Sequence, residues 1–88
     1  MKIKGEYIIR DVAGESVAIP IGGTVLESNI IVALNSSGRF LWELLVKGGT
    51  EEELTAAMCG EYDTEPETAR ADILEFAEYL KRNKVEIE

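Results

Sequence analysis

Hydrophobic residues recur at every second position in the first part of the chain and at helical spacing from about residue 40 onward. Residues 7–12 and 16–20 are rich in β-branched and aromatic side chains, and Ala13-Gly14-Glu15 separates them as a short turn. These two segments predict an antiparallel hairpin. A third strand is predicted at residues 29–34, so this part of the chain is expected to form a three-stranded antiparallel sheet.

The second and third predicted strands differ in their polarity. Val17, Ile19 and Ile21 alternate along the second strand, which predicts that these three residues form its buried face. The third strand, residues 29–34, is apolar on both faces. Two interpretations of this pattern remain open: loops of the protein cover the second face, or a partner covers it and the strand edge accepts an incoming strand.

Three helices are predicted after the sheet, whereas residues 25–28 fit either a tight connection or the start of a strand. The first helix covers about residues 37–46, and Asn35, Ser36 and Ser37 are each suitable N-caps for it. A Gly-Gly pair then ends this helix. Its aromatic and leucine residues, together with one phenylalanine of the third helix, are expected in the core: Leu41, Trp42, Leu44 and Phe76.

The second and third helices both begin at capping signals. Thr50 and Glu53 match a capping box at the start of the second helix. Thr64 is a candidate N-cap for the third, and Pro66 suits its first turn because the missing N–H would be unpaired there anyway. The third helix has one apolar stripe, formed by Ala69, Ile73, Phe76, Ala77 and Leu80.

Composition limits the functions that this chain can perform. Its 88 residues, 45% of them hydrophobic, predict one domain over residues 1–88 that is too small to enclose a deep catalytic cavity. The sequence has no histidine and one cysteine, which argues against a disulfide framework, a tetrahedral zinc set and the usual general base. We therefore predict a protein that is not an enzyme, has no catalytic residues, metal site or cofactor, and binds through its surface. No secretory signal or membrane span is evident, which predicts a cytoplasmic location.

The net charge of −8 argues against binding to nucleic acids and to anionic membranes, because both are negatively charged. Three helices joined by tight turns to a small sheet nevertheless resemble a winged-helix DNA-binding transcriptional regulator, which is the alternative function. The third helix carries Asp72, Glu75 and Glu78 in its central turns. A recognition helix normally carries Arg, Lys, Asn or Gln toward the bases, so charge disfavours this alternative.

Residues 34–45, Leu-Asn-Ser-Ser-Gly-Arg-Phe-Leu-Trp-Glu-Leu-Leu, resemble the Leu-Asn-x-(Ser/Thr)-(Gly/Ala)-x-x-Leu-Trp-x-Leu-Leu signature of the PqqD family. Residues 49–54 and 71–76 are also similar to that family's pattern, and the resemblance spans nearly the whole chain. It implies an α+β, winged-helix-like fold with an N-terminal three-stranded antiparallel sheet followed by three helices. It also implies a recognition element that binds the leader of a ribosomally synthesised, post-translationally modified peptide (RiPP). Such elements present the precursor to a modifying enzyme, often a radical S-adenosylmethionine (SAM) protein.

The family binds its leader as a strand added to the third strand, in the cleft beside the third helix. The sequence leaves open which face of that helix points outward. The resemblance implies a peptide-binding surface on the third strand and on outward residues of the helix: Asn29, Ile30, Ile31, Val32, Ala33, Leu34, Arg70, Ile73, Leu74, Ala77 and Lys81.

A cluster of basic residues lies on or after the third helix, at Arg70, Lys81, Arg82 and Lys84. Salt screens the interaction between charges that lie more than about 8 Å apart. Close to a bound peptide, this cluster can therefore outweigh the net charge of the whole protein. We therefore expect an acidic leader to bind, with Arg70 and Lys81 contributing to its affinity.

Overall fold

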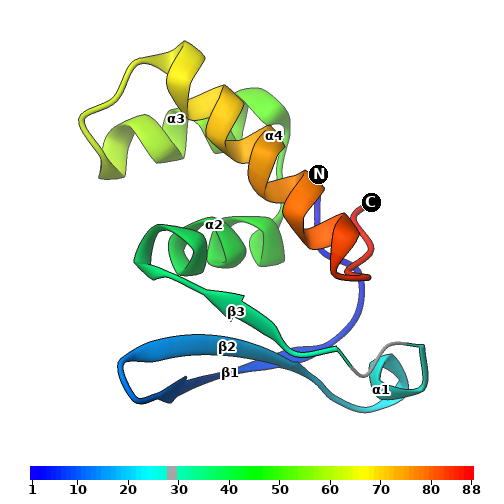
Figure 1. Ribbon diagram of the computed structural model, residues 1–88. Coiled ribbons are helices and arrows are strands. Elements are labelled where there is room, and N and C mark those ends of the chain that lie inside the picture. Colours follow the sequence, from blue (N-terminus) through cyan, green and yellow to red (C-terminus); the bar gives the residue numbers. More distant parts are fainter. Residues whose placement is uncertain (28–29) are drawn as a thin grey trace.

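Three strands form one antiparallel sheet, and the longer helices lie on one side of it (Figure 1). The protein is described by a computed structural model over residues 1–27 and 30–88. Its elements in chain order are β1 (Tyr7–Val12), β2 (Glu15–Pro20), α1 (Gly23–Glu27), β3 (Val32–Leu34), α2 (Ser36–Lys47), α3 (Glu51–Glu61) and α4 (Pro66–Arg82). The strand order is β1-β2-β3, so β3 lies at one edge of the sheet.

The hairpin of β1 and β2 closes through a two-residue turn in which Ala13 and Gly14 both have positive φ, at 52° and 84°. Positive φ at both central residues matches the turn to the right-handed twist of the strands. The predicted buried face of β2 is wrong, because Ala18 and Pro20 face the core whereas Val17 and Ile19 are only half-buried. Both faces of this strand are apolar, so alternation could not choose between them.

The third strand is shorter than predicted and buries only one face. It spans Val32–Leu34, with Val32 and Leu34 buried and Ala33 exposed, and the preceding Ile31 is 58% exposed. Asn29 lies outside the described residues. The ambiguous segment before it belongs largely to the five-residue helix α1, which is neither the strand start nor the tight connection expected from the sequence.

The N-caps predicted from the sequence are present in α2 and α3 but not in α4. Asn35 caps α2, its side chain accepting from the backbone N–H of Gly38 at 2.7 Å. Thr50 and Glu53 form both bonds of the predicted capping box of α3. The N-cap prediction for Thr64 is wrong, because α4 begins at Pro66 and no side chain caps it.

The core between the sheet and the helices contains the predicted apolar stripe of α4, all five residues of which are buried. Trp42 is 2% exposed, and its ring meets the ring of Tyr7 edge-on at 5.0 Å. Leu41 and Phe76 are also buried, and Leu44 is half-buried. These contacts join α2, α4 and β1 into one core.

The chain ends lie side by side at one end of α4 (Figure 1). Ile3 and Ile87 form an antiparallel bridge, and Lys2 and Glu88 exchange two backbone hydrogen bonds of 3.3 and 2.7 Å. Val85, just after α4, is 2% exposed. Residues 85–88, in which apolar and acidic residues alternate, therefore pair with the N-terminal segment.

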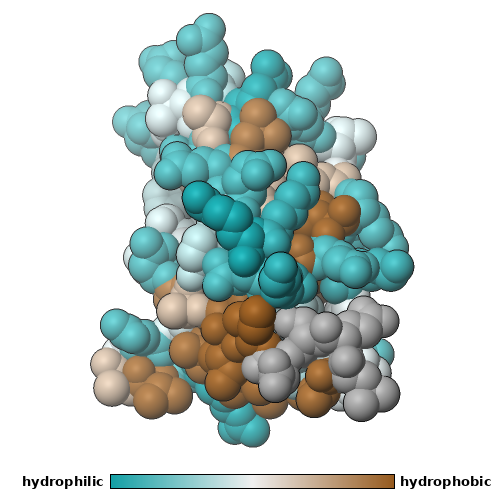
Figure 2. All heavy atoms as spheres, turned by 45° about the vertical axis from the view of Figure 1, so that its right-hand side comes forward, coloured by the Kyte–Doolittle hydropathy of each residue, from teal (hydrophilic) through white to brown (hydrophobic). Residues whose placement is uncertain are grey.

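The surface is divided by polarity. Figure 2 shows hydrophobic residues gathered over the lower part of the molecule, where the sheet and α1 lie, and hydrophilic residues over the helices above. None of the helices in the described ranges is long and apolar enough to cross a membrane. Exposed apolar surface of this kind often marks a site of interaction with another molecule.

Candidate functional site

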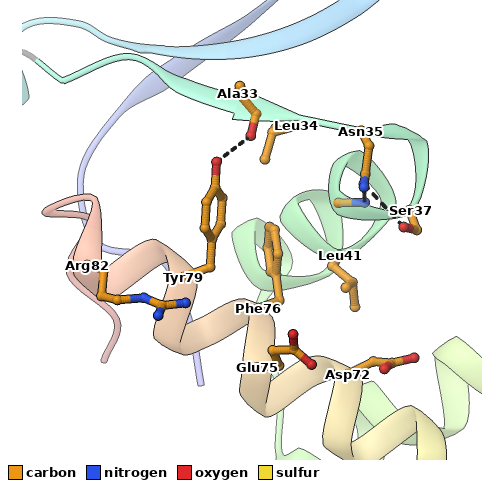
Figure 3. Close-up of a pocket in the computed structure, with 11 residues that line it drawn as sticks. Ala33, Leu34, Asn35, Ser37, Leu41, Asp72, Glu75, Phe76, Tyr79 and Arg82 are labelled. Atoms are coloured by element: carbon orange, nitrogen blue, oxygen red, sulfur yellow. Dashed lines mark hydrogen bonds between the residues drawn. The ribbon is translucent and has the colours of Figure 1, made fainter.

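A groove of about 460 Å³ lies between β3, the start of α2 and one side of α4 (Figure 3). Its walls come from segments far apart in the sequence, which the helix packing brings together. The lining residues are Ala33, Leu34, Asn35, Ser37, Gly38, Leu41, Asp72, Glu75, Phe76, Tyr79 and Arg82.

The floor of the groove is apolar and closely packed. Leu34, Leu41 and Phe76 are all at least nine-tenths buried, so only a small part of each side chain reaches the groove. At Gly38, a Cβ atom would lie at an ordinary 3.5 Å from the Phe76 ring but at only 3.0 Å from Oδ1 of Asn35, so glycine leaves room for the Asn35 cap. This floor suits contact with apolar side chains of a bound molecule.

One wall of the groove is the outer edge of β3. Ala33 pairs with Val17 of β2, and its carbonyl oxygen accepts a hydrogen bond from the Tyr79 hydroxyl at 2.8 Å (Figure 3). In an antiparallel strand, the N–H and C=O of one residue point to the same side. Ala33 therefore presents both backbone groups toward α4, and its acceptor is occupied by Tyr79.

The helix wall carries charge of both signs. Asp72 and Glu75 lie toward the start of α2, whereas Arg82 lies at the opposite end beside Tyr79 (Figure 3). None of these three side chains forms a hydrogen bond or an ion pair with the described part of the protein. A helix face with two carboxylates does not suit the phosphates of a DNA backbone.

Comparisons with known proteins identify the family of this chain. The family model of coenzyme PQQ synthesis protein D (PqqD) matches residues 24–85. The chain belongs to the PqqD family. Among solved structures, it is similar to one described as TbiB1 in complex with the TbiA(beta) leader peptide. That structure has 25% sequence identity and a TM-score of 0.72, over 98% of this chain and 95% of the other. No curated protein matches the sequence.

The PqqD fold confirms the predicted architecture, an α+β, winged-helix-like domain with an N-terminal antiparallel sheet followed by helices. The structure adds the short helix α1 between β2 and β3 to the three predicted helices. It places two predicted strand residues in the lining of the groove, Ala33 in its wall and Leu34 in its floor. Val32 is buried beside them, while Ile30 and Ile31 precede β3 and do not line the groove.

Two α4 residues of the predicted peptide-binding surface are buried in this PqqD domain. Ile73 and Ala77 were expected to point outward, but they are 1% and 4% exposed and belong to the core. Arg70 points toward α3, where it lies 3.2 Å from Glu51. The exposed residues Leu74 and Lys81 do not line the groove either.

Sequence reasoning missed most of the α4 residues that line the groove. These residues recur at helical spacing along a stripe beside the buried one: Asp72, Glu75, Phe76, Tyr79 and Arg82. Phe76 belongs to both stripes, and a second aromatic residue follows it three positions later. That aromatic pair at the edge of the apolar stripe was the signal available in the sequence.

A second polar cluster, formed by Asp11, Ser16 and Arg39, stabilises the fold and does not line the groove. Asp11 of β1 accepts hydrogen bonds from Ser16 at 2.8 Å and from Arg39 at 2.7 Å, and together they lower the pKa of its carboxyl group. The contact ties the hairpin to α2. Within the described ranges, no group of three or more histidine, cysteine or acidic residues is arranged to hold a metal ion.

Proposed function

We propose that this PqqD-family domain binds the leader of a ribosomally synthesised precursor peptide and presents that precursor to a modifying enzyme. The observation that carries the proposal is the edge of β3, where Ala33 turns its backbone groups toward an open groove. The similarity to TbiB1, which was solved with the TbiA(beta) leader peptide, supports the same use of this chain.

Binding by strand addition would divide recognition between backbone and side chains. The N–H and C=O of Ala33 would pair with the peptide backbone and set its register. Alternate peptide side chains would then face the groove floor at Leu34, Leu41 and Phe76, which would select apolar residues. The proposed peptide-binding surface therefore joins β3 to the Asp72–Tyr79 side of α4.

We also propose that residues 1–88 act as one non-catalytic domain in the cytoplasm, with a radical SAM maturase as the modifying enzyme. The absence of histidine from the sequence supports a binding role, because histidine is the commonest general base. The family resemblance supports the choice of enzyme partner. Co-purification of the domain with a radical SAM maturase, with and without the precursor, tests this partner.

The strand-addition model is tested by a proline at the strand edge. Ala33→Pro removes the N–H that faces the groove while leaving the bonds between β3 and β2 in place. Loss of one hydrogen bond, together with the added ring, should weaken leader binding about tenfold. Binding is measured by calorimetry with a synthetic leader peptide that the original domain binds.

Ala33→Ser is the matched control, because it changes the same side chain and keeps both backbone groups. It should bind the leader with nearly unchanged affinity. An Ala33→Pro variant that keeps its circular dichroism spectrum and binds as well as the original protein would contradict strand addition. Binding of duplex DNA at physiological salt, in place of the leader, would instead favour the alternative function, a winged-helix DNA-binding transcriptional regulator.

A further inference from the structure

The unpaired charges of the groove allow an inference about the peptide itself, which rests on the proposed function. Asp72 and Glu75 lie at one end, and Arg82 lies at the other (Figure 3). Neighbouring basic residues of α4 are already engaged, Arg70 with Glu51 at 3.2 Å and Lys81 with Glu78 at 3.8 Å. Among the described residues, the groove charges have no such partner and are therefore available to a ligand.

The length of the helix sets the spacing of complementary charges on the peptide. Asp72 and Arg82 are ten positions apart, which corresponds to roughly 15 Å along a helix that rises 1.5 Å per residue. An extended peptide covers about 3.3 Å per residue, so it spans this distance in roughly four or five residues. Side chains on one face of a strand are an even number of positions apart, which selects a spacing of about four.

The direction of the peptide follows from the sheet. Both strand pairs are antiparallel, and a peptide that continues this pattern runs opposite to β3. Figure 3 shows that β3 runs from the Arg82 end toward the Asp72 end. The peptide would therefore enter at Asp72 and leave at Arg82.

We propose that the groove selects a leader segment in which a basic residue is followed, about four positions later, by an acidic residue. The basic side chain would lie between Asp72 and Glu75, and the acidic side chain would meet Arg82. Burial beside the peptide removes water from these charges, so a like charge or an apolar side chain at either position would be disfavoured.

A displayed library of random 15-residue peptides tests the proposal without the natural leader. Selection against the original domain at physiological salt should enrich the basic-to-acidic order at a spacing of about four by roughly tenfold. Arg82→Glu should replace the selected acidic residue by a basic one. Lys81→Glu is the matched control, because it makes the same charge change one position earlier and outside the groove; its selected peptides should match those of the original domain.

The outcomes separate this proposal from the proposed function. If no peptide is enriched, peptide binding fails and the charge proposal fails with it. Enriched peptides without the charge pair, or with the reverse order, overturn the charge proposal and leave peptide binding supported. Equal changes in the selected peptide sequences for Arg82→Glu and Lys81→Glu would also overturn it, because the overall electrostatic field of the protein would then explain both.

Discussion

At the scale of single residues, Tyr79 connects the two walls of the groove. Its hydroxyl donates to the Ala33 carbonyl across 46 positions of sequence. That carbonyl is also the acceptor that an added strand needs. In the free protein, Tyr79 thus satisfies a backbone group that would otherwise face solvent, and a peptide bound by strand addition would compete with it for the Ala33 carbonyl.

We expect Tyr79→Phe to bind the leader more tightly, because the variant keeps the ring but frees the Ala33 carbonyl. One hydrogen bond contributes about 0.5–1.5 kcal/mol net, which corresponds to roughly two- to twelvefold in affinity. Fluorescence anisotropy with a labelled leader measures the change. Tyr62→Phe is the control, since that ring packs on Phe40 at 5.5 Å, outside the groove. Weaker binding by Tyr79→Phe would show that the hydroxyl bonds to the peptide and does not compete with it.

At the scale of elements, α3 depends on the capping box at its N-terminus. The backbone N–H of Thr50 donates to the Glu53 carboxylate at 2.9 Å, and the N–H of Glu53 donates to the Thr50 hydroxyl at 3.1 Å. Hydrogen bonding from the Thr50 backbone, followed by its side chain, lowers the pKa of Glu53 below the ordinary value of 4.5. The folded state therefore favours the charged form of this residue.

This pKa shift predicts how stability depends on pH. A lowered folded pKa contributes stability that is complete above about pH 4.5 and is lost as pH falls through the folded value. Glu53→Gln should therefore unfold at lower urea concentration than the original protein at pH 7, and the difference should shrink below pH 4.5. Glu52→Gln, in the same turn but without a side-chain hydrogen bond among the described residues, should change stability little. A difference for Glu53→Gln that stays constant from pH 7 to 3 would contradict the role of its charge.

At the scale of the whole molecule, the two chain ends close the fold. Residues from both ends enter the same core, with Ile3 at 6% and Val85 at 2% exposure. The backbone pairing of Lys2 with Glu88 holds the segments together. The short tail after α4 therefore contributes to the stability of the entire domain.

Val85→Ala should lower the free energy of unfolding by about 2 kcal/mol, because it removes two buried carbons and leaves a small cavity. That is a large share of the roughly 5–15 kcal/mol available to a domain. Urea denaturation followed by tryptophan fluorescence measures the loss. Glu88→Ala, whose side chain is exposed, should change stability by less than about 0.5 kcal/mol. Equal stability of Val85→Ala and the original protein would show that the tail does not support the core.

Features that depend on near neighbours were determined by the sequence alone. The hairpin, the Thr50 capping box and the buried stripe of α4 were predicted from residues within a few positions of one another, and Asn35 was one of three N-cap candidates for α2. The similarities at residues 34–45, 49–54 and 71–76 together predicted the family, which the family model over residues 24–85 confirms. In each case the interaction that fixes the feature is local.

Features that depend on contacts between distant segments were decided by the tertiary structure. The buried face of β2, the short length of β3 and the groove side of α4 could not be read from periodicity, because more than one face was apolar or charged. Tyr79 reaches the groove only because of how α4 packs against α2 and β3. The groove exists where these elements meet, so its residues became visible only when the chain was folded.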